Sequence, residues 1–135
     1  MLGNKFRTVE MVKLSLVFGI LLGTLALSAC NQEVERQAAA MTGGDPSRGR
    51  AAISRYGCAT CHTIPGIRGA DALVGPPLNQ MASRSYIAGV LPNTPDNMIR
   101  WIENPPQIDH LTVMPNLGVS EMDARDIAGY LYTLK

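Results

Sequence analysis

Two cysteines and a histidine stand close together in the stretch YGCATCHTIPG, residues 56–66. Cys58, Cys61 and His62 form a C-x-x-C-H motif, the attachment pattern of c-type haem. One turn of chain brings both sulfurs to one edge of a porphyrin, and the imidazole that follows is directed at the iron from the same face. The motif predicts one covalently bound haem c with His62 as an axial ligand.

Two other chemistries use closely spaced cysteines. A thioredoxin-type disulfide pair would need a βαβ context, and the sequence has no such pattern. A zinc site would need a fourth ligand, and His110 is the chain's other histidine. Both alternatives are weaker than haem attachment.

The second axial ligand decides whether the iron is closed to substrates. Met114 in TVMPNLGVS lies in an irregular stretch between two expected helices, and Pro115 stiffens the backbone beside it. A loop of this kind can present a thioether to the far face of a haem, so Met114 is the predicted ligand. The alternatives are a gap-filling role for Met114 and ligation by His110, which we expect at the surface. The other methionines after residue 30 are Met41, Met81, Met98 and Met122.

Three helices should position these residues. Asp45 and Pro46 start a helix over about 46–56, and Thr94 and Pro95 start another that ends before Pro105. Ser120 opens the last helix, and no alternating strand pattern or internal repeat competes. The prediction is an all-α fold of three to five helices around the haem.

The N-terminus has the features of an export signal. Residues 14–29, LSLVFGILLGTLALSA, are uncharged, follow three basic residues, and are too short for a comfortable membrane span. The ending LSAC resembles the lipobox of bacterial lipoproteins, which predicts cleavage after residue 29 and a lipid on Cys30. An ordinary signal or marginal anchor is the alternative, and Met11 is a second candidate start.

The predicted organisation has three parts. Residues 1–29 are a signal peptide, residues 30–44 a lipidated cysteine with a flexible, Ala/Gly-rich tether, and residues 45–135 the folded domain. The protein is then exported and lipid-anchored on the periplasmic or outer face of a bacterial membrane.

The charge balance limits the classes of partner, and the aromatic content bears on what fills the core. Residues 1–29 hold three of the 12 Lys and Arg and one of the 11 Asp and Glu, so the remainder carries 9 cations against 10 anions. No basic patch suggests nucleic acid. Both phenylalanines lie in the signal, which leaves a thin aromatic core and predicts that another group fills the centre.

The sequence resembles a class I cytochrome c over about residues 45–135, above all the cytochrome c domain of caa3-type oxidase subunit II. The segments that carry the likeness are GCATCHTI, GPPLNQMASR, LPNTPDNMIRWIENP, MPNLGVS and DIAGYLYTL. The resemblance implies that Cys58 and Cys61 hold the haem and that His62 and Met114 ligate the iron. It also implies that the Pro76 carbonyl accepts the His62 N–H, Leu78 and Trp101 pack on the ring, Arg84 pairs with a propionate, and Gly49 lets the first helix approach the Tyr130 face of the last.

Two features depart from that family pattern. The copper-binding domain of oxidase subunit II needs several His and Cys ligands, and this chain has too few for one. The lysine-rich docking face of mitochondrial cytochrome c is also missing, because Lys135 is the only lysine after residue 29.

The leading hypothesis is therefore a membrane-tethered one-electron carrier that catalyses nothing itself. Its expected partners are a terminal oxidase, a quinol-oxidising complex, and the membrane through Cys30. The competing hypothesis is a haem enzyme or sensor of the peroxidase type, which would need a labile sixth ligand and distal acid/base groups.

Overall fold

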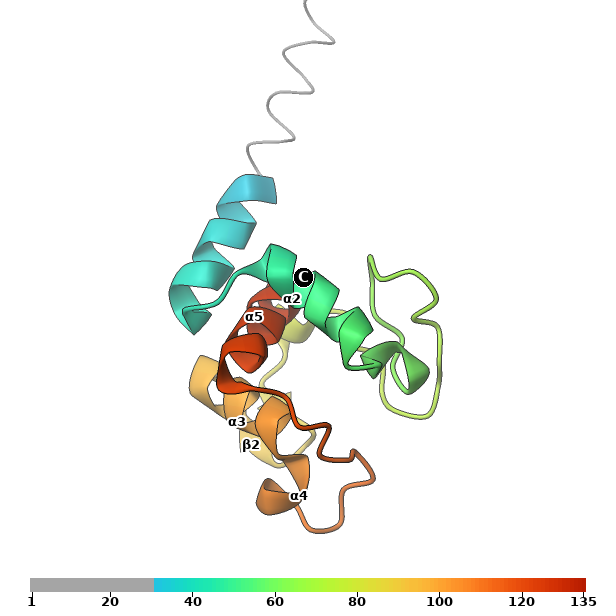
Figure 1. Ribbon diagram of the computed structural model, residues 1–135. Helices are drawn as coiled ribbons and strands as arrows, with labels where there is room; N and C mark the ends of the chain where they lie inside the picture. The colour runs from blue at the N-terminus through green and yellow to red at the C-terminus, as the bar shows by residue number, and fades with distance from the viewer. Residues whose placement is uncertain (1–30) are drawn as a thin grey trace, which may run out of the picture. The chain divides into compact units, whose positions relative to one another are not determined.

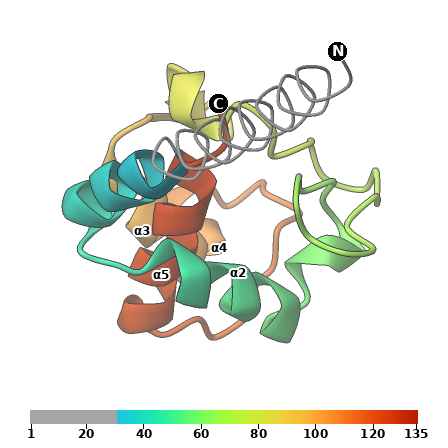
Figure 2. The same ribbon diagram turned by 90° about the horizontal axis from the view of Figure 1, so that it is seen from above.

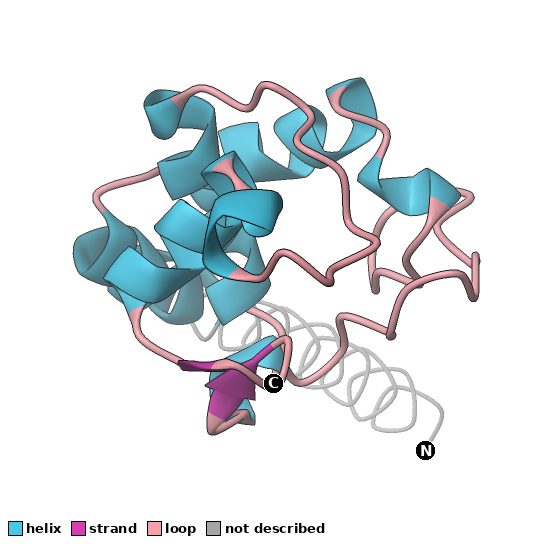
Figure 3. Ribbon diagram, turned by 90° about the horizontal axis from the view of Figure 1, so that it is seen from below, coloured by secondary structure: helices cyan, strands magenta, loops and turns pink. Residues whose placement is uncertain are grey.

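The computed structural model describes residues 31–135, and this part of the chain is mostly helical (Figures 1 and 3). The predictions for the signal peptide and for Cys30 lie outside the described residues. Residues 34–135 form one compact unit. After a helical segment at residues 31–42, its named elements are α2 (Pro46–Arg55), the 3-10 turns η1 (Cys58–Thr60) and η2 (Met81–Ser83), β1 (Tyr86–Ile87), β2 (Leu91–Pro92), α3 (Pro95–Glu103), α4 (Pro105–Ile108) and α5 (Glu121–Tyr132).

The three longest named helices begin where the sequence predicts. The side chain of Asp45 accepts from two backbone N–H groups of the first turn of α2. Thr94 accepts from the Asn97 N–H at the start of α3, and Ser120 accepts from the Asp123 N–H at the start of α5. Each cap satisfies donors that have no partner within the helix, so the boundaries follow from local chemistry.

Helices α2 and α5 pack closely through glycine. A Cβ on Gly49 would collide with the carbonyl oxygen of Asp126 in α5. The family resemblance implied that Gly49 allows a close approach to the Tyr130 face of the last helix, and the contact lies one turn earlier on that face, at Asp126. Tyr130 itself donates its hydroxyl to the Pro65 carbonyl at 2.7 Å and holds the loop beyond the cysteine motif.

A buried carboxylate joins the same two helices. Asp126 is 2% exposed and accepts from the Asp45 N–H at 2.6 Å and from Arg48 Nε at 2.7 Å. Burial disfavours the charged form, but the hydrogen bonds from Arg48 and Asp45 outweigh it and hold the pKa of Asp126 below its ordinary value. The carboxylate therefore favours the folded state when it is ionised.

We expect Asp126→Asn to lower the free energy of unfolding by about 1 to 2 kcal/mol at neutral pH, because one charge-assisted contact is lost. A carboxylate with a depressed folded pKa contributes stability above its unfolded pKa of about 3.9, and that stability is lost as pH falls through the folded value. The difference between the variants should shrink below about pH 4 in denaturant titrations. The exposed pair of Glu121 with Arg125 supplies a control, since Glu121→Gln should cost much less. An Asn variant as stable as wild type at pH 7 would contradict this role.

The core lies between α2, α3 and α5. Met98, Trp101 and Ile102 form the buried face of α3, and Ile127 and Leu131 that of α5. Both sets recur at the three- and four-residue spacing of a single helix face. The mostly helical content agrees with an all-α class in broad terms.

One small sheet departs from that class. Strands β1 and β2 pair antiparallel, with Tyr86 opposite Pro92 and Ile87 opposite Leu91. Ala88 and Gly89 in the connecting turn both have positive φ, at 51° and 77°, as a tight hairpin requires. Strands of two residues are too short to leave an alternating pattern, so the sequence did not predict them.

The segment before residue 45 also differs from expectation. Residues 31–42 are helical, and Ala38 and Thr42 are 2% and 1% exposed. Composition indicated a flexible tether over residues 30–44, and the structure corrects this for the part that packs in the compact unit, residues 34–44. The small residues Thr42 and Gly44 allow a close approach to α5 that hydrophobicity alone does not predict.

Candidate functional site

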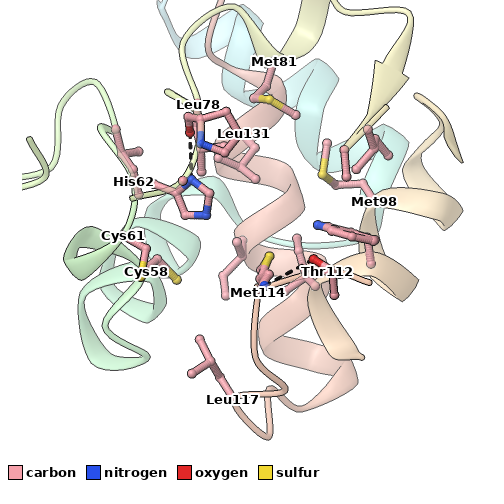
Figure 4. A pocket seen from close by; sticks show the side chains of 18 of the residues that line it. Cys58, Cys61, His62, Leu78, Met81, Met98, Thr112, Met114, Leu117 and Leu131 are labelled. Atoms are coloured by element: carbon pink, nitrogen blue, oxygen red, sulfur yellow. Dashed lines mark hydrogen bonds between the residues drawn. The ribbon is translucent and has the colours of Figure 1, made fainter. Parts of the chain in front are cut away.

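The cysteine motif forms a tight turn directly after α2. Gly57 adopts φ 71° and redirects the chain into η1. The backbone N–H groups of Cys61 and His62 both bond to the Cys58 carbonyl, at 3.3 and 3.1 Å. The turn places both cysteines and His62 along one wall of a pocket (Figure 4).

The two cysteines are half-buried free thiols. Burial raises the pKa of the Cys58 thiol above its ordinary value. Redox-active C-x-x-C pairs depend on a lowered thiol pKa, so this environment does not favour the disulfide-exchange alternative.

His62 is oriented by the backbone. Its Nδ1 lies 2.7 Å from the Pro76 carbonyl oxygen, which can only accept, so Nδ1 carries the proton. Nε2 then retains its lone pair as a potential metal donor. The resemblance implied this same contact with Pro76.

Glycine makes the orientation of His62 possible, and sequence reasoning did not single it out. A Cβ on Gly75 would lie 2.7 Å from His62 Nδ1 and closer still to Cε1. The Gly75 N–H also donates to the Cys61 carbonyl at 2.7 Å, which ties the two segments together. In the sequence, Gly75 opens GPPLNQMASR, one of the segments that carry the family resemblance, and that position is the signal that could have identified it.

Gly75→Ala should therefore displace the imidazole and break its bond to Pro76. We expect a loss of protein stability of about 2 kcal/mol and, for protein loaded with the haem that the motif predicts, a shifted visible spectrum from weakened ligation by His62. Gly69→Ala is a matched control in the same loop, because nothing lies within 4 Å of its Cβ position, although its positive φ makes some strain unavoidable. An unchanged spectrum in Gly75→Ala, with the control also unchanged, would contradict the packing argument.

The pocket itself has a volume of about 390 Å³, within the range of ligand sites. Its lining is mainly apolar and comes from the η1 region, the loop before η2, α3, the segment after α4, and α5. All eight candidate cofactor-binding residues line it: Cys58, Cys61, His62, Pro76, Leu78, Arg84, Trp101 and Met114.

Met114 reaches the pocket from another segment than His62. It lies in the irregular stretch between α4 and α5, is half-buried, and donates its backbone N–H to Thr112 Oγ1 at 3.2 Å. Figure 4 shows its side chain entering the pocket across from the cysteine wall. Thr112 is a second supporting residue that the sequence did not reveal.

The other candidate ligands are placed differently. Met81 and Met98 also line the pocket but are 4% and 1% exposed and belong to the core. Met41 and Met122 are exposed and lie outside the lining. His110 is exposed and also lies outside it.

Arg84 and Trp101 frame the pocket on the side of η2 and α3. The Arg84 guanidinium donates to the carbonyls of Pro77 and Asn79, which holds its cation beside the lining. Trp101 is 7% exposed, so its ring forms part of the apolar wall. Pairing of Arg84 with a propionate stays a prediction.

The donor set fits a covalently held haem. Two thiols and an imidazole nitrogen stand on one wall, a thioether enters from another segment, and the space between is apolar.

Within residues 31–135, no three His, Cys, Asp or Glu side chains gather in a way that could hold a metal ion. Nor does any helix in that range have the length and apolar character to span a membrane.

Fold and pocket together define a mostly helical domain built around an apolar cavity with sulfur and nitrogen donors. Its sequence is similar to cytochrome c oxidase subunit 2 of Alkalihalophilus pseudofirmus (strain ATCC BAA-2126 / JCM 17055 / OF4), with 32% identity over 90 residues. These residues are 66% of this chain and 25% of the relative, so the chain spans about a quarter of the curated relative's length. No family model matches the sequence, and no solved structure matches it. The match supports a relation to oxidase subunit II.

Proposed function

We propose that this protein is a membrane-tethered monohaem c-type cytochrome of class I that passes single electrons to a terminal oxidase. The observation that carries the proposal is the pocket, which gathers the C-x-x-C-H residues, the Pro76 carbonyl and Met114 around one apolar space. The similarity to an oxidase subunit supports a respiratory chain as the setting.

The residues have distinct tasks in this proposal. Cys58 and Cys61 would bind the haem through thioethers, and His62 and Met114 would ligate its iron. Pro76 fixes the His62 tautomer and raises the basicity of Nε2, while the apolar lining excludes water. The bound haem would supply reversible one-electron chemistry, with a potential raised by methionine ligation.

The pocket lining favours a carrier over a peroxidase-like enzyme. Acid/base catalysis at a haem needs a titratable group beside the open site. Among the described residues that line the pocket, His62 is the only histidine and no Asp or Glu is present. The described lining therefore suits a haem that transfers electrons, and it contains no distal acid or base for catalysis.

Membrane anchoring through Cys30 gives the carrier its route to partners. With 9 cations against 10 anions after residue 29, long-range electrostatic steering is weak, and confinement to the membrane raises the local concentration instead. We expect Cys30→Ser to release the protein from membranes or leave it uncleaved. Oxygen uptake by membranes supplied with dilute variant should fall at least about tenfold.

The same assay separates tethering from charge docking. Wild-type turnover should change little across a salt series, and high concentrations of soluble Cys30→Ser should restore the lost rate. An unchanged haem spectrum in the variant controls for folding. Full activity of the dilute soluble variant, or steep inhibition of wild type by salt, would count against tethered delivery.

A further inference from the structure

The segment at residues 34–42 packs against the rest of the domain along one stripe. Val34, Ala38 and Thr42 recur at every fourth position, and burial increases along them from half-buried to 1% exposed. Glu35 and Ala40, on other faces, are exposed. This spacing is that of a helix docked by one face.

The contact surface lies on α5. The carbonyl of Thr42 accepts from Arg125 Nη1 at 3.2 Å, and a Cβ on Gly129 would lie 3.2 Å from Thr42 Oγ1. A Cβ on Gly44 would collide with the Arg125 carbonyl, so backbone packs on backbone here. Figure 2 shows the segment beside α5, as these contacts require.

The end of the segment is fixed as well. Gly43 adopts φ 69° and its N–H bonds to the Ala39 carbonyl at 2.9 Å, a glycine C-cap. Asp45 then bonds through its N–H to the buried Asp126 carboxylate. From Thr42 to α2 the chain is therefore held by contacts with α5, and burial of Val34 and Ala38 extends the packed face back to residue 34.

The docked segment and the pocket use different faces of α5. Arg125 and Gly129 contact the segment, whereas Ile127 and Leu131 line the pocket. At about 100° per residue, residues two apart on a helix point to nearly opposite sides. The segment therefore leaves the pocket uncovered.

We propose that residues 34–42 are an orienting arm, which restricts the anchored domain to a narrow range of orientations relative to the membrane. In these orientations the pocket lies on the side of the domain away from the arm. The proposal rests on the proposed function, because it takes Cys30 as the point of lipid attachment. Only residues 31–33 separate Cys30 from the docked arm, a span of at most about 14 Å when fully extended. A fourteen-residue flexible tether would have an r.m.s. reach of about 20 Å and free rotation.

The arm also defines the class of partner. A domain on so short a connection cannot reach an electron-exchange surface far from the bilayer, because effective concentration falls to nearly zero beyond the linker's span. The fitting partner is an integral membrane redox complex whose docking site lies close to the membrane surface.

The test uses full-length, lipidated, haem-loaded protein in stacked bilayers of phosphatidylethanolamine and phosphatidylglycerol. Ala38→Arg places a charge on the docked face, and Ala40→Arg places the same side chain on an exposed face as control. Amide hydrogen exchange of residues 34–42 should be slow in wild type and control, and at least about tenfold faster in Ala38→Arg. The oxidised haem's electron paramagnetic resonance should vary with bilayer angle in wild type and control but not in Ala38→Arg.

A second variant leaves the folded unit untouched. Six Gly and Ser residues inserted between Asn31 and Gln32 should preserve slow exchange of residues 34–42 yet abolish the angular dependence. Fast exchange of these residues in wild type, or angle-independent resonance from lipidated wild type, would overturn the arm. Intact mass without acyl chains would instead refute the anchor, and hydrogen exchange would still report whether the arm is docked.

Discussion

Replacing Cys58 and Cys61 together by serine is expected to yield protein that loses its haem on a denaturing gel and is largely unfolded. Without thioether bonds to the two cysteines, the haem would no longer be held covalently in the pocket. An empty cavity of about 390 Å³ costs at most about 9 kcal/mol at roughly 24 cal/mol per Å³. The free energy of unfolding of an ordinary domain is about 5–15 kcal/mol, so a loss of this size could unfold the protein.

The control for this double variant lies in the same turn. Thr60→Ser keeps the hydroxyl that bonds to the Gly57 carbonyl at 2.8 Å, so the turn should hold and the haem should stay attached. Haem staining after denaturing electrophoresis and far-ultraviolet circular dichroism measure the two effects separately. A folded, colourless double variant would remove the basis of the proposed cofactor.

Met114→Ala should abolish the weak far-red absorption band of the oxidised protein and open the iron to cyanide or carbon monoxide. The potential should fall on the order of 0.2 V, a fraction of the about 0.8 V range that axial ligands control. The physical reason is that an alanine methyl cannot replace the thioether that enters the pocket from the loop after α4.

Two other methionines provide the controls for that variant. Met81→Ala and Met98→Ala also shorten pocket-lining side chains, but both residues are core residues, and each change should cost about 2–5 kcal/mol of stability while the band persists. Loss of the band in Met81→Ala or Met98→Ala, with Met114→Ala unaffected, would show that the axial assignment is wrong.

Local chemistry made much of the fold predictable. Asp45, Thr94 and Ser120 cap the helices that the sequence assigned to them, because a cap is decided by a side chain and its next three residues. Cys58, Cys61, His62 and Met114 were predicted from the residues themselves. The family resemblance implied the other four, Pro76, Leu78, Arg84 and Trp101, and all eight line one cavity.

What the sequence missed depends on contacts between distant segments. Gly75 matters through its distance to the His62 ring, thirteen positions earlier, and Gly44 through its close approach to the Arg125 carbonyl. The docking of Thr42 and Gly44 on α5 relies on small residues on both surfaces, with Gly129 opposite Thr42. Close packing of small side chains leaves no hydrophobic signal in a single segment, so composition alone predicts a tether where the structure has a docked arm.

The visible spectrum of the oxidised full-length protein, taken before and after denaturation, tests the covalent haem and its methionine ligand together. We expect low-spin haem that remains attached after denaturation, with the weak far-red band of methionine ligation in the native state. That band would reflect Met114 facing His62 across the pocket shown in Figure 4. A colourless protein, haem that separates on denaturation, or a native spectrum without the band would contradict the account.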